Sequence, residues 1–153
     1  MNAMTLASGA ELGAHPAMAL LVGGIAAAFL KGRAASIVMV VVPLVGLYHV
    51  SGLENDSFST LSLFGLEIKS VMVDQQAWLF GLLFHIAALV AGIYSFHVRD
   101  RWQVSMALLY AASAVGVAFA GDMLSLFLWW EALAIPSVFQ SWGRRNKISE
   151  ESG

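Results

Sequence analysis

Long apolar runs separated by short polar segments dominate the hydrophobic pattern of the chain. Five such runs cover about residues 14–30, 34–50, 75–98, 104–120 and 122–142. At about 1.5 Å rise per residue, each approaches the roughly 30 Å thickness of a bilayer's hydrocarbon core. The first run is the shortest and reaches spanning length only if residues 10–15 join the helix or Lys31 snorkels to the interface. The pattern predicts an all-α integral membrane protein with five transmembrane helices.

Residues 53–73 are the one sizeable extramembrane stretch between these runs. Within it, residues 58–64 and 66–71 are β-prone and partly alternate between apolar and polar, with Gly65 between them. Alternation around a glycine is typical of a hairpin, but the signal in these two short segments is weak. A small β-hairpin on the outer face and an irregular loop both agree with it.

The positive charges fall almost entirely on one side of this arrangement. With the N-terminus outside, the inner segments 31–33, 99–103 and 143–153 hold Lys31, Arg33, Arg99, Arg101, Arg144, Arg145 and Lys147. The outer segments hold Lys69 together with Glu11, Glu54, Asp56, Glu67, Asp74 and Asp122. The positive-inside rule therefore places the N-terminus outside and the C-terminus in the cytoplasm. Residues 144–153 are expected to form a polar, disordered cytoplasmic tail.

A cleavable signal peptide is not expected. Positive charges precede the apolar stretch of a secretory signal, whereas here Lys31 and Arg33 follow it and residues 1–15 contain no Lys or Arg.

Composition agrees with a membrane protein and restricts its chemistry. The 153 residues are 59% hydrophobic and 12% charged. The lack of cysteine excludes disulfides, Cys-ligated metal centres and thiol nucleophiles. A net charge of −2 without a basic patch argues against a nucleic-acid partner. No phosphate-binding loop, catalytic triad or metal-spaced histidine pair is visible, so we expect no cofactor, no metal and no enzymatic activity of the chain alone.

Glu131 is the most informative polar residue. It lies nine residues after Asp122, which places it about 13.5 Å deep and near the middle of the bilayer. A carboxylate there is costly and is by default a functional site. Its same-face neighbours are all apolar, namely Phe127, Leu128, Ala134, Ile135 and Val138. We expect Glu131 to bind protons or ions; the alternative is a neutral, hydrogen-bonded carboxylic acid with a structural role.

His85 is the one deep residue that could carry a positive charge opposite Glu131. Ten residues beyond Gln75, it is about 15 Å deep, at nearly the same level as Glu131. Its imidazole could exchange protons, or it could pack as a neutral ring with one hydrogen bond. His49, His97 and Asp74 lie close to the interfaces, where solvated or snorkelling roles are expected.

Two further features concern helix geometry. Ala112, Gly116 and Ala120 form a small-xxx-small seam that predicts close helix packing. Pro136 cannot donate to the carbonyl of Ala132, so a helix distortion is expected one turn beyond Glu131.

The segment around Glu131 resembles a known family. Residues 122–139, with the pair Trp130-Glu131, are similar to the fifth transmembrane helix of antiporter-like subunits. Weaker matches are Val73-Asp74, Tyr94-Ser95-Phe96-His97, and residues 84–88 and 119–122. The overall pattern, from the first helix to Arg145, most resembles the D-type antiporter-like component of Mrp-type multisubunit Na⁺/H⁺ antiporters. Related subunits pump protons in complex I and in membrane-bound hydrogenases.

This resemblance implies a function and a setting. In the family, the helix-five glutamate pairs with a lysine on a later, broken helix, so Glu131 would belong to a proton or ion pathway. The resemblance also implies a multi-pass protein of the bacterial cytoplasmic (inner) membrane that works with other membrane subunits, one of which supplies a mid-membrane lysine. Protons and possibly Na⁺ would be carried. Any redox activity would belong to partner subunits, as in an NADH:quinone oxidoreductase-like or hydrogenase-like translocase.

Three hypotheses follow, because family members are several times longer and contain a lysine partner that this sequence lacks. The first is an ion-translocating subunit, split or truncated relative to the family and completed by another chain. The second is a small scaffold subunit of such a complex, without transport activity of its own. The third is an independent membrane protein that forms homo-oligomers.

Overall fold

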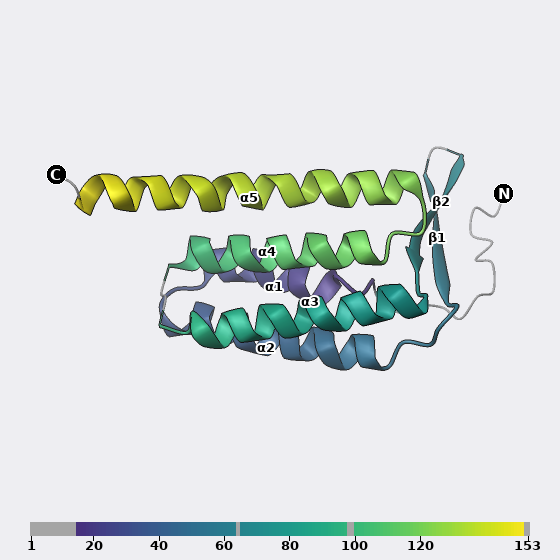
Figure 1. Cartoon of the computed structure of the whole chain (residues 1–153), viewed down its shortest axis with the longest axis horizontal. Coiled ribbons are helices and arrows are strands. Elements are labelled where there is room, and N and C mark those ends of the chain that lie inside the picture. The colour runs from purple at the N-terminus through teal and green to yellow at the C-terminus, as the bar shows by residue number, and fades with distance from the viewer. Residues whose placement is uncertain (1–14, 64, 98–99, 152–153) are drawn as a thin grey trace.

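Five helices and one hairpin make up the part of the chain described by the computed structural model, residues 15–63, 65–97 and 100–151. Side chains are described in the same ranges except at 63, 66 and 143–151. In chain order (Figure 1) the elements are α1 (Met18–Phe29), α2 (Arg33–Ser51), β1 (Phe58–Leu63), β2 (Leu66–Met72), α3 (Gln75–Tyr94), α4 (Arg101–Ala118) and α5 (Met123–Glu151). The prediction of five helices is confirmed, and the hairpin rather than the irregular loop is present.

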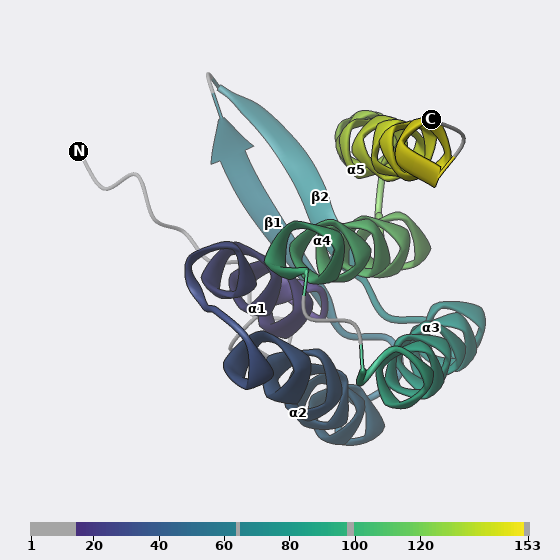
Figure 2. The same ribbon diagram turned by 90° about the vertical axis from the view of Figure 1, so that its left-hand side faces the viewer.

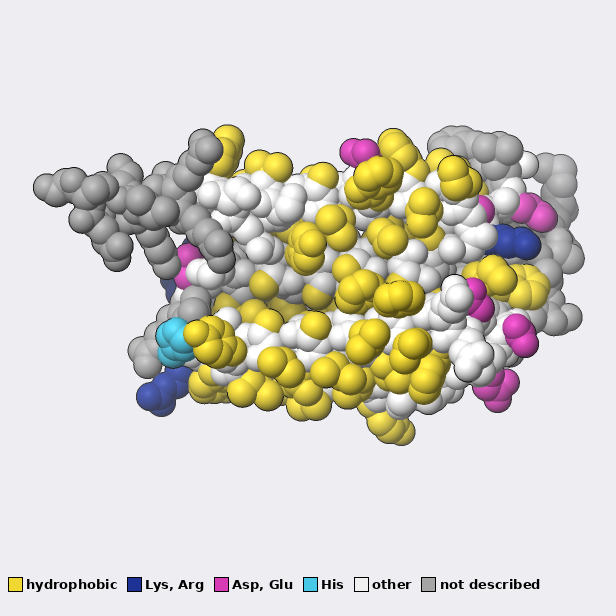
Figure 3. All heavy atoms as spheres, in the orientation of Figure 1, with side chains coloured by type: hydrophobic (Ala, Val, Ile, Leu, Met, Phe, Trp, Pro, Cys, Tyr) yellow, Lys and Arg dark blue, Asp and Glu magenta, His cyan; other side chains and the backbone are white. Residues whose placement is uncertain are grey.

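Three helices of the described chain are long and apolar enough to cross a membrane. They are α2, α3 and the part of α5 from Met123 to Trp142. The apolar helix α1 has only 12 residues, and α4 is not among the three. Hydrophobic side chains cover the flank of the molecule between its two ends (Figure 3). This surface suits a lipid or protein environment better than water.

Helices α1 to α4 form a bundle, and α5 lies outside it. α4 packs against α1, α3 and α5, and α2 packs against α1 and α3. Viewed along the helices (Figure 2), α4 separates α5 from α1, α2 and α3. The largest fully buried side chains, led by Phe119, Leu20 and Leu108, come from other parts of the chain than α5. Within its described part, α5 buries only Ser125 and Pro136, so most of its surface is free to face lipid or another protein.

Small residues let α1 approach α4 closely. A Cβ added to Gly24 would lie 2.9 Å from the Leu109 side chain and 3.1 Å from the Leu109 backbone nitrogen. The Ser105 hydroxyl donates to the Gly24 carbonyl over 2.7 Å. Close backbone approach plus an interhelical hydrogen bond is a common way to hold membrane helices together.

The hairpin is fastened to the connection between α4 and α5. The strands are antiparallel with a β-bulge between Ser59 and Thr60, and Gly65 turns between them with φ +79°. The Met72 N–H donates to the Phe119 carbonyl over 2.8 Å, and the Gly121 N–H donates to the Lys69 carbonyl over 3.2 Å. These bonds satisfy backbone groups along one edge of β2. The hairpin is therefore hydrogen-bonded to the α4–α5 connection at one end of the bundle, which we call the hairpin end.

Several helix bounds differ from those expected. α1 begins at Met18 rather than near 14, although residue 14 itself lies outside the described residues. α3 ends at Tyr94 rather than at 98, which also lies outside them. α4 begins at Arg101 rather than 104, because the Asp100 carboxylate accepts from the Trp102 N–H over 3.0 Å and caps the helix. Hydropathy alone carries no information about such a cap.

The expected end of the fifth helix at 142 coincides with the end of its apolar part, Met123–Trp142, but the helix itself does not stop there. α5 continues to Glu151. The tail contains no proline, and most of its residues tolerate a helix, so the helix propagates without a new nucleus. α5 also stays helical through Pro136, so any distortion there is confined to the hydrogen bond that proline cannot donate to Ala132.

Candidate functional site

Glu131 lies on the open side of α5. Its side chain is exposed, and α5 packs chiefly against α4, with a smaller contact to β2. Its exposed neighbours on the helix are large and apolar, namely Phe127, Leu128, Trp130, Ile135 and Val138. Among the described residues no hydrogen bond or ion pair to the Glu131 carboxylate is found. We call this surface, made of Glu131 and those five residues, the Glu131 face.

His85 occupies a different place, inside the bundle between α3 and α2. It is fully buried, and its Nδ1 lies 2.7 Å from the Gly81 carbonyl oxygen. Its Nε2 is buried without a hydrogen-bond partner. The ring packs so closely on Gly46 of α2 that a Cβ there would overlap it. Glu131 and His85 share a depth along their helices, but their side chains do not meet.

The surroundings of His49 differ from those expected from the sequence. It was expected in a solvated role near the interface, yet it is half-buried and interacts electrostatically with His85. A signal was present in the sequence, because Gly46 precedes His49 by three positions and so shares its helix face. Only the packing of α2 on α3 shows that this face meets a histidine.

The predicted small-residue seam is only partly on α4, because the helix ends at Ala118, before Ala120. Ala112 is buried and Ala120 is half-buried. Gly116 lies directly under the indole of Trp129 in α5, where an added Cβ would overlap the ring. Gly116 thus determines how closely α5 approaches α4, while the Trp129 ring holds α5 in place.

A second contact to Trp129 comes from His15, just before α1. The two ring centroids are 4.9 Å apart with an interplanar angle of 39°. The His15 Nδ1 accepts from the Ala17 N–H over 3.1 Å, and its Nε2 faces the Ser70 backbone without a well-formed hydrogen bond. Burial lowers the pKa of His15 to about 4, although the Ser70 backbone partly offsets this effect. The neutral ring thus joins α5, β2 and the start of α1.

We expect acid to loosen this junction. The pKa of His15 is about 4 in the fold against an ordinary value of 6.5, so the unfolded chain binds more protons between these values. Stability should therefore fall as the pH drops from about 6.5 towards 4. His15→Phe keeps an aromatic ring on Trp129 but cannot titrate, so it should flatten this part of the profile. Thermal unfolding of the chain in lipid nanodiscs over this pH range measures the difference.

Exposed His97 provides the matched control, because His97→Phe should leave the slope unchanged. An identical slope in wild type and His15→Phe would contradict the assignment.

Asp122 anchors the start of α5 at the hairpin end. Its carboxylate accepts from the Ser125 N–H and from the Lys69 N–H, each over 2.7 Å. These backbone donors, Ser125 first, hold the pKa of the Asp122 carboxyl below its usual range. Asp122 is therefore an ionised helix cap that ties α5 to β2, and not a group that exchanges protons near neutral pH.

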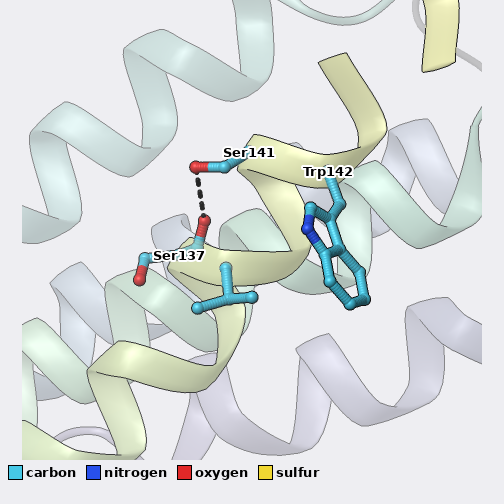
Figure 4. A pocket seen from close by; sticks show the side chains of 4 residues that line it. Ser137, Ser141 and Trp142 are labelled. Atoms are coloured by element: carbon cyan, nitrogen blue, oxygen red, sulfur yellow. Dashed lines mark hydrogen bonds between the residues drawn. The ribbon is translucent and has the colours of Figure 1, made fainter. Parts of the chain in front are cut away.

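Two hollows lie beside α5. A groove of about 600 Å³ runs between α3, α4 and α5 and is lined mainly by alanines and aromatic rings. A smaller pocket of about 260 Å³ lies at Ser137, Val138, Ser141 and Trp142 (Figure 4). There the Ser141 hydroxyl donates to the Ser137 carbonyl over 3.1 Å, and the Ser137 hydroxyl donates to Ala134 over 2.7 Å. Both serine hydroxyl protons are therefore used within α5.

No group of three or more His, Asp or Glu residues that could hold a metal ion is present in the described part of the chain. Comparison of the chain with protein-family models, with curated proteins and with solved structures finds no match in any of the three. The functional argument therefore depends on the geometry.

Proposed function

We propose that the chain is a membrane-spanning subunit of a proton- or cation-translocating complex, to which it contributes Glu131. The observation that supports this proposal is an unpaired carboxylate, exposed in the middle of an otherwise apolar helix face. An ionisable group at mid-bilayer is costly unless it is protonated, paired or hydrated. In this proposal Glu131 gains a partner from another membrane segment, and α5 presents it outward, where such a segment can pack.

In this proposal all five helices cross the membrane, with the N-terminus outside. The described charges support that orientation. Lys31, Arg33 and Arg101 lie at the end of the bundle opposite the hairpin, and the hairpin end holds Glu54, Asp56, Glu67, Asp74 and Asp122 together with Lys69. Acidic side chains gather at the hairpin end of the flank seen in Figure 3. By the positive-inside rule, the hairpin end faces outward.

The partner of Glu131 is a membrane helix with a basic side chain at the same depth. The likeness to the D-type component of Mrp-type antiporters suggests a lysine on a neighbouring membrane subunit in the bacterial inner membrane. A carboxylate facing a lysine could carry protons, and a carboxylate alone could bind Na⁺ or H⁺. The chain itself is proposed as a non-redox component.

The scaffold hypothesis is the second candidate, and the same surface favours it. Phe127, Trp130 and Ile135 are more than half exposed. Such a face would bind another subunit even if Glu131 merely formed a hydrogen bond there. In the homo-oligomer hypothesis, the occupant would be a second copy of this chain.

Photocrosslinking from the Glu131 face tests the proposal. A photoreactive phenylalanine analogue at Ile135, one turn from Glu131, should capture a membrane protein in native membranes. The captured peptide should come from a spanning helix with Lys, Arg or His within one turn of the crosslink. The matched control is Val45, which is 55% exposed on α2, far from the Glu131 face along the bundle surface, and should give lipid adducts.

Each alternative gives a different product in the same experiment. An adduct of twice the chain's mass would support the homo-oligomer. A captured helix without any basic residue would support the scaffold. Lipid adducts alone at position 135 would overturn all three assignments for this face.

A further inference from the structure

The seam between α2 and α3 contains an ionisable site that does not include Glu131. The two antiparallel helices meet at two successive levels. At the first, nearer the hairpin end, a Cβ added to Gly81 would lie 3.2 Å from the Val50 side chain. At the second, one turn deeper on both helices, the His85 ring lies against Gly46. Gly46 provides the space that the imidazole fills.

His49 lies between these two levels on α2. It precedes Val50 by one residue and follows Gly46 by three, so it shares the face that meets α3. It is half-buried and close to the hairpin end of α2, which ends at Ser51. It is close enough to act electrostatically on His85. His49 is therefore placed between the hairpin end and the buried ring of His85.

The hydrogen bonding of His85 leaves one nitrogen able to accept a proton. A carbonyl oxygen can only accept, so the Nδ1 next to the Gly81 oxygen carries the hydrogen. The Nε2 then bears a lone pair, and it is buried without a protein partner. Buried polar atoms are almost always hydrogen-bonded, so the lack of a partner for the His85 Nε2 requires an explanation.

We propose that His49 and His85 form a proton-binding pair in the α2–α3 seam, entered from the hairpin end past His49. The proton binds the lone pair of the His85 Nε2, which gives an imidazolium whose Nδ1–H still donates to Gly81. Release returns the proton from the same Nε2. The site is separate from the Glu131 face and does not depend on the partner that Glu131 requires.

His49 is the titratable side chain that couples to His85 among the described residues of the surrounding elements. The other titratable or charged groups on α2, α3 and α4 are Arg33, Tyr48, Tyr94, Arg101 and Tyr110. Arg33, Tyr94 and Arg101 lie at the end of the bundle opposite the hairpin, and Tyr48 and Tyr110 are exposed. Asp74, at the hairpin end of α3, is engaged as a cap by the Ala77 N–H over 2.6 Å.

Nitrogen NMR of the full chain in lipid nanodiscs tests the pair without any partner subunit. With ¹⁵N-labelled histidine, the His85 signals at high pH should show hydrogen on Nδ1 and none on Nε2. On acidification, Nε2 should gain a proton while the chain stays folded. In His49→Gln, the pH midpoint of this change should shift, because the neighbouring titratable ring is removed.

Two variants separate proton binding from a packing role. His97→Gln, at the opposite end of α3, should leave the His85 midpoint unmoved. Gly46→Ala should displace the ring and change the Nε2 signal, whereas Gly52→Ala, with nothing nearer than 3.7 Å to the added Cβ, should not.

The proposal is overturned if the His85 Nε2 of the wild type stays unprotonated throughout the pH range in which the chain is folded. It is equally overturned if the midpoint is the same with and without His49. Neither result would bear on Glu131, whose test requires the assembled complex.

Discussion

Glu131→Gln is expected to abolish ion-coupled transport by the assembled complex and to leave its assembly intact. Gln has nearly the same shape and can still hydrogen-bond a basic partner, but it can neither carry a proton nor balance a cation's charge. Loss of a group that transfers protons typically lowers the rate by about 10²-fold or more. The measurement is the initial rate of proton or Na⁺ movement in inverted membrane vesicles, together with the yield of intact complex.

Glu54→Gln is the matched control for this substitution. Glu54 is an exposed carboxylate at the hairpin end, and its backbone carbonyl, rather than its side chain, accepts from Ser57. The same chemical change there should leave transport unaltered. Full transport by Glu131→Gln would rule out a role in the pathway, and loss of the complex itself would favour the scaffold hypothesis.

Gly116→Ala is expected to destabilise the attachment of α5 to α4. The added Cβ would overlap the Trp129 indole, whose other contacts include the His15 ring. A shift of the indole would disturb its tilted contact with the His15 ring, so we expect the helices to separate instead. Overpacking of this kind costs about 1–3 kcal/mol. Thermal unfolding in nanodiscs, with the accessibility of α5 to a protease as a local probe, measures the loss.

A second substitution identifies the Trp129 contact as the cause. Trp129→Leu should remove the overlap, so the double variant should lose less than the sum of the two single losses. Gly52→Ala adds the same methyl group where nothing lies within ordinary contact distance except two backbone carbonyls, and it should be nearly neutral. Additive losses in the double variant would contradict the assigned contact.

Depth in the bundle could be predicted from the sequence, because the rise of a helix is constant. Counting from the helix ends placed Glu131 and His85 at one level. Such a count does not say which neighbouring helix a side chain faces. In the structure, α4 lies between α5 and the other helices. A shared depth was therefore compatible with two side chains that never meet.

Which residue faces which could not be predicted, because one helix face can meet any of several neighbours. The pairing of Gly46 with His85, and of Gly116 with Trp129, depends on how the helices are arranged around α4. The role of His15 depends on a hairpin more than forty positions later in the chain, where the backbone of Ser70 lies near its ring.

The five helices, the absence of cysteine chemistry and the one carboxylate in the middle of an apolar helix could be predicted from the sequence, whereas the hairpin around Gly65 remained open against an irregular loop. The predicted features follow from composition, local periodicity and the length of each apolar run, all of which act within a single segment. The packing of the helices, in contrast, turns Glu131 away from the bundle and places the His85 ring against Gly46. Those outcomes depend on which small residues allow two helices to approach, and that is a property of pairs of segments rather than of any one of them.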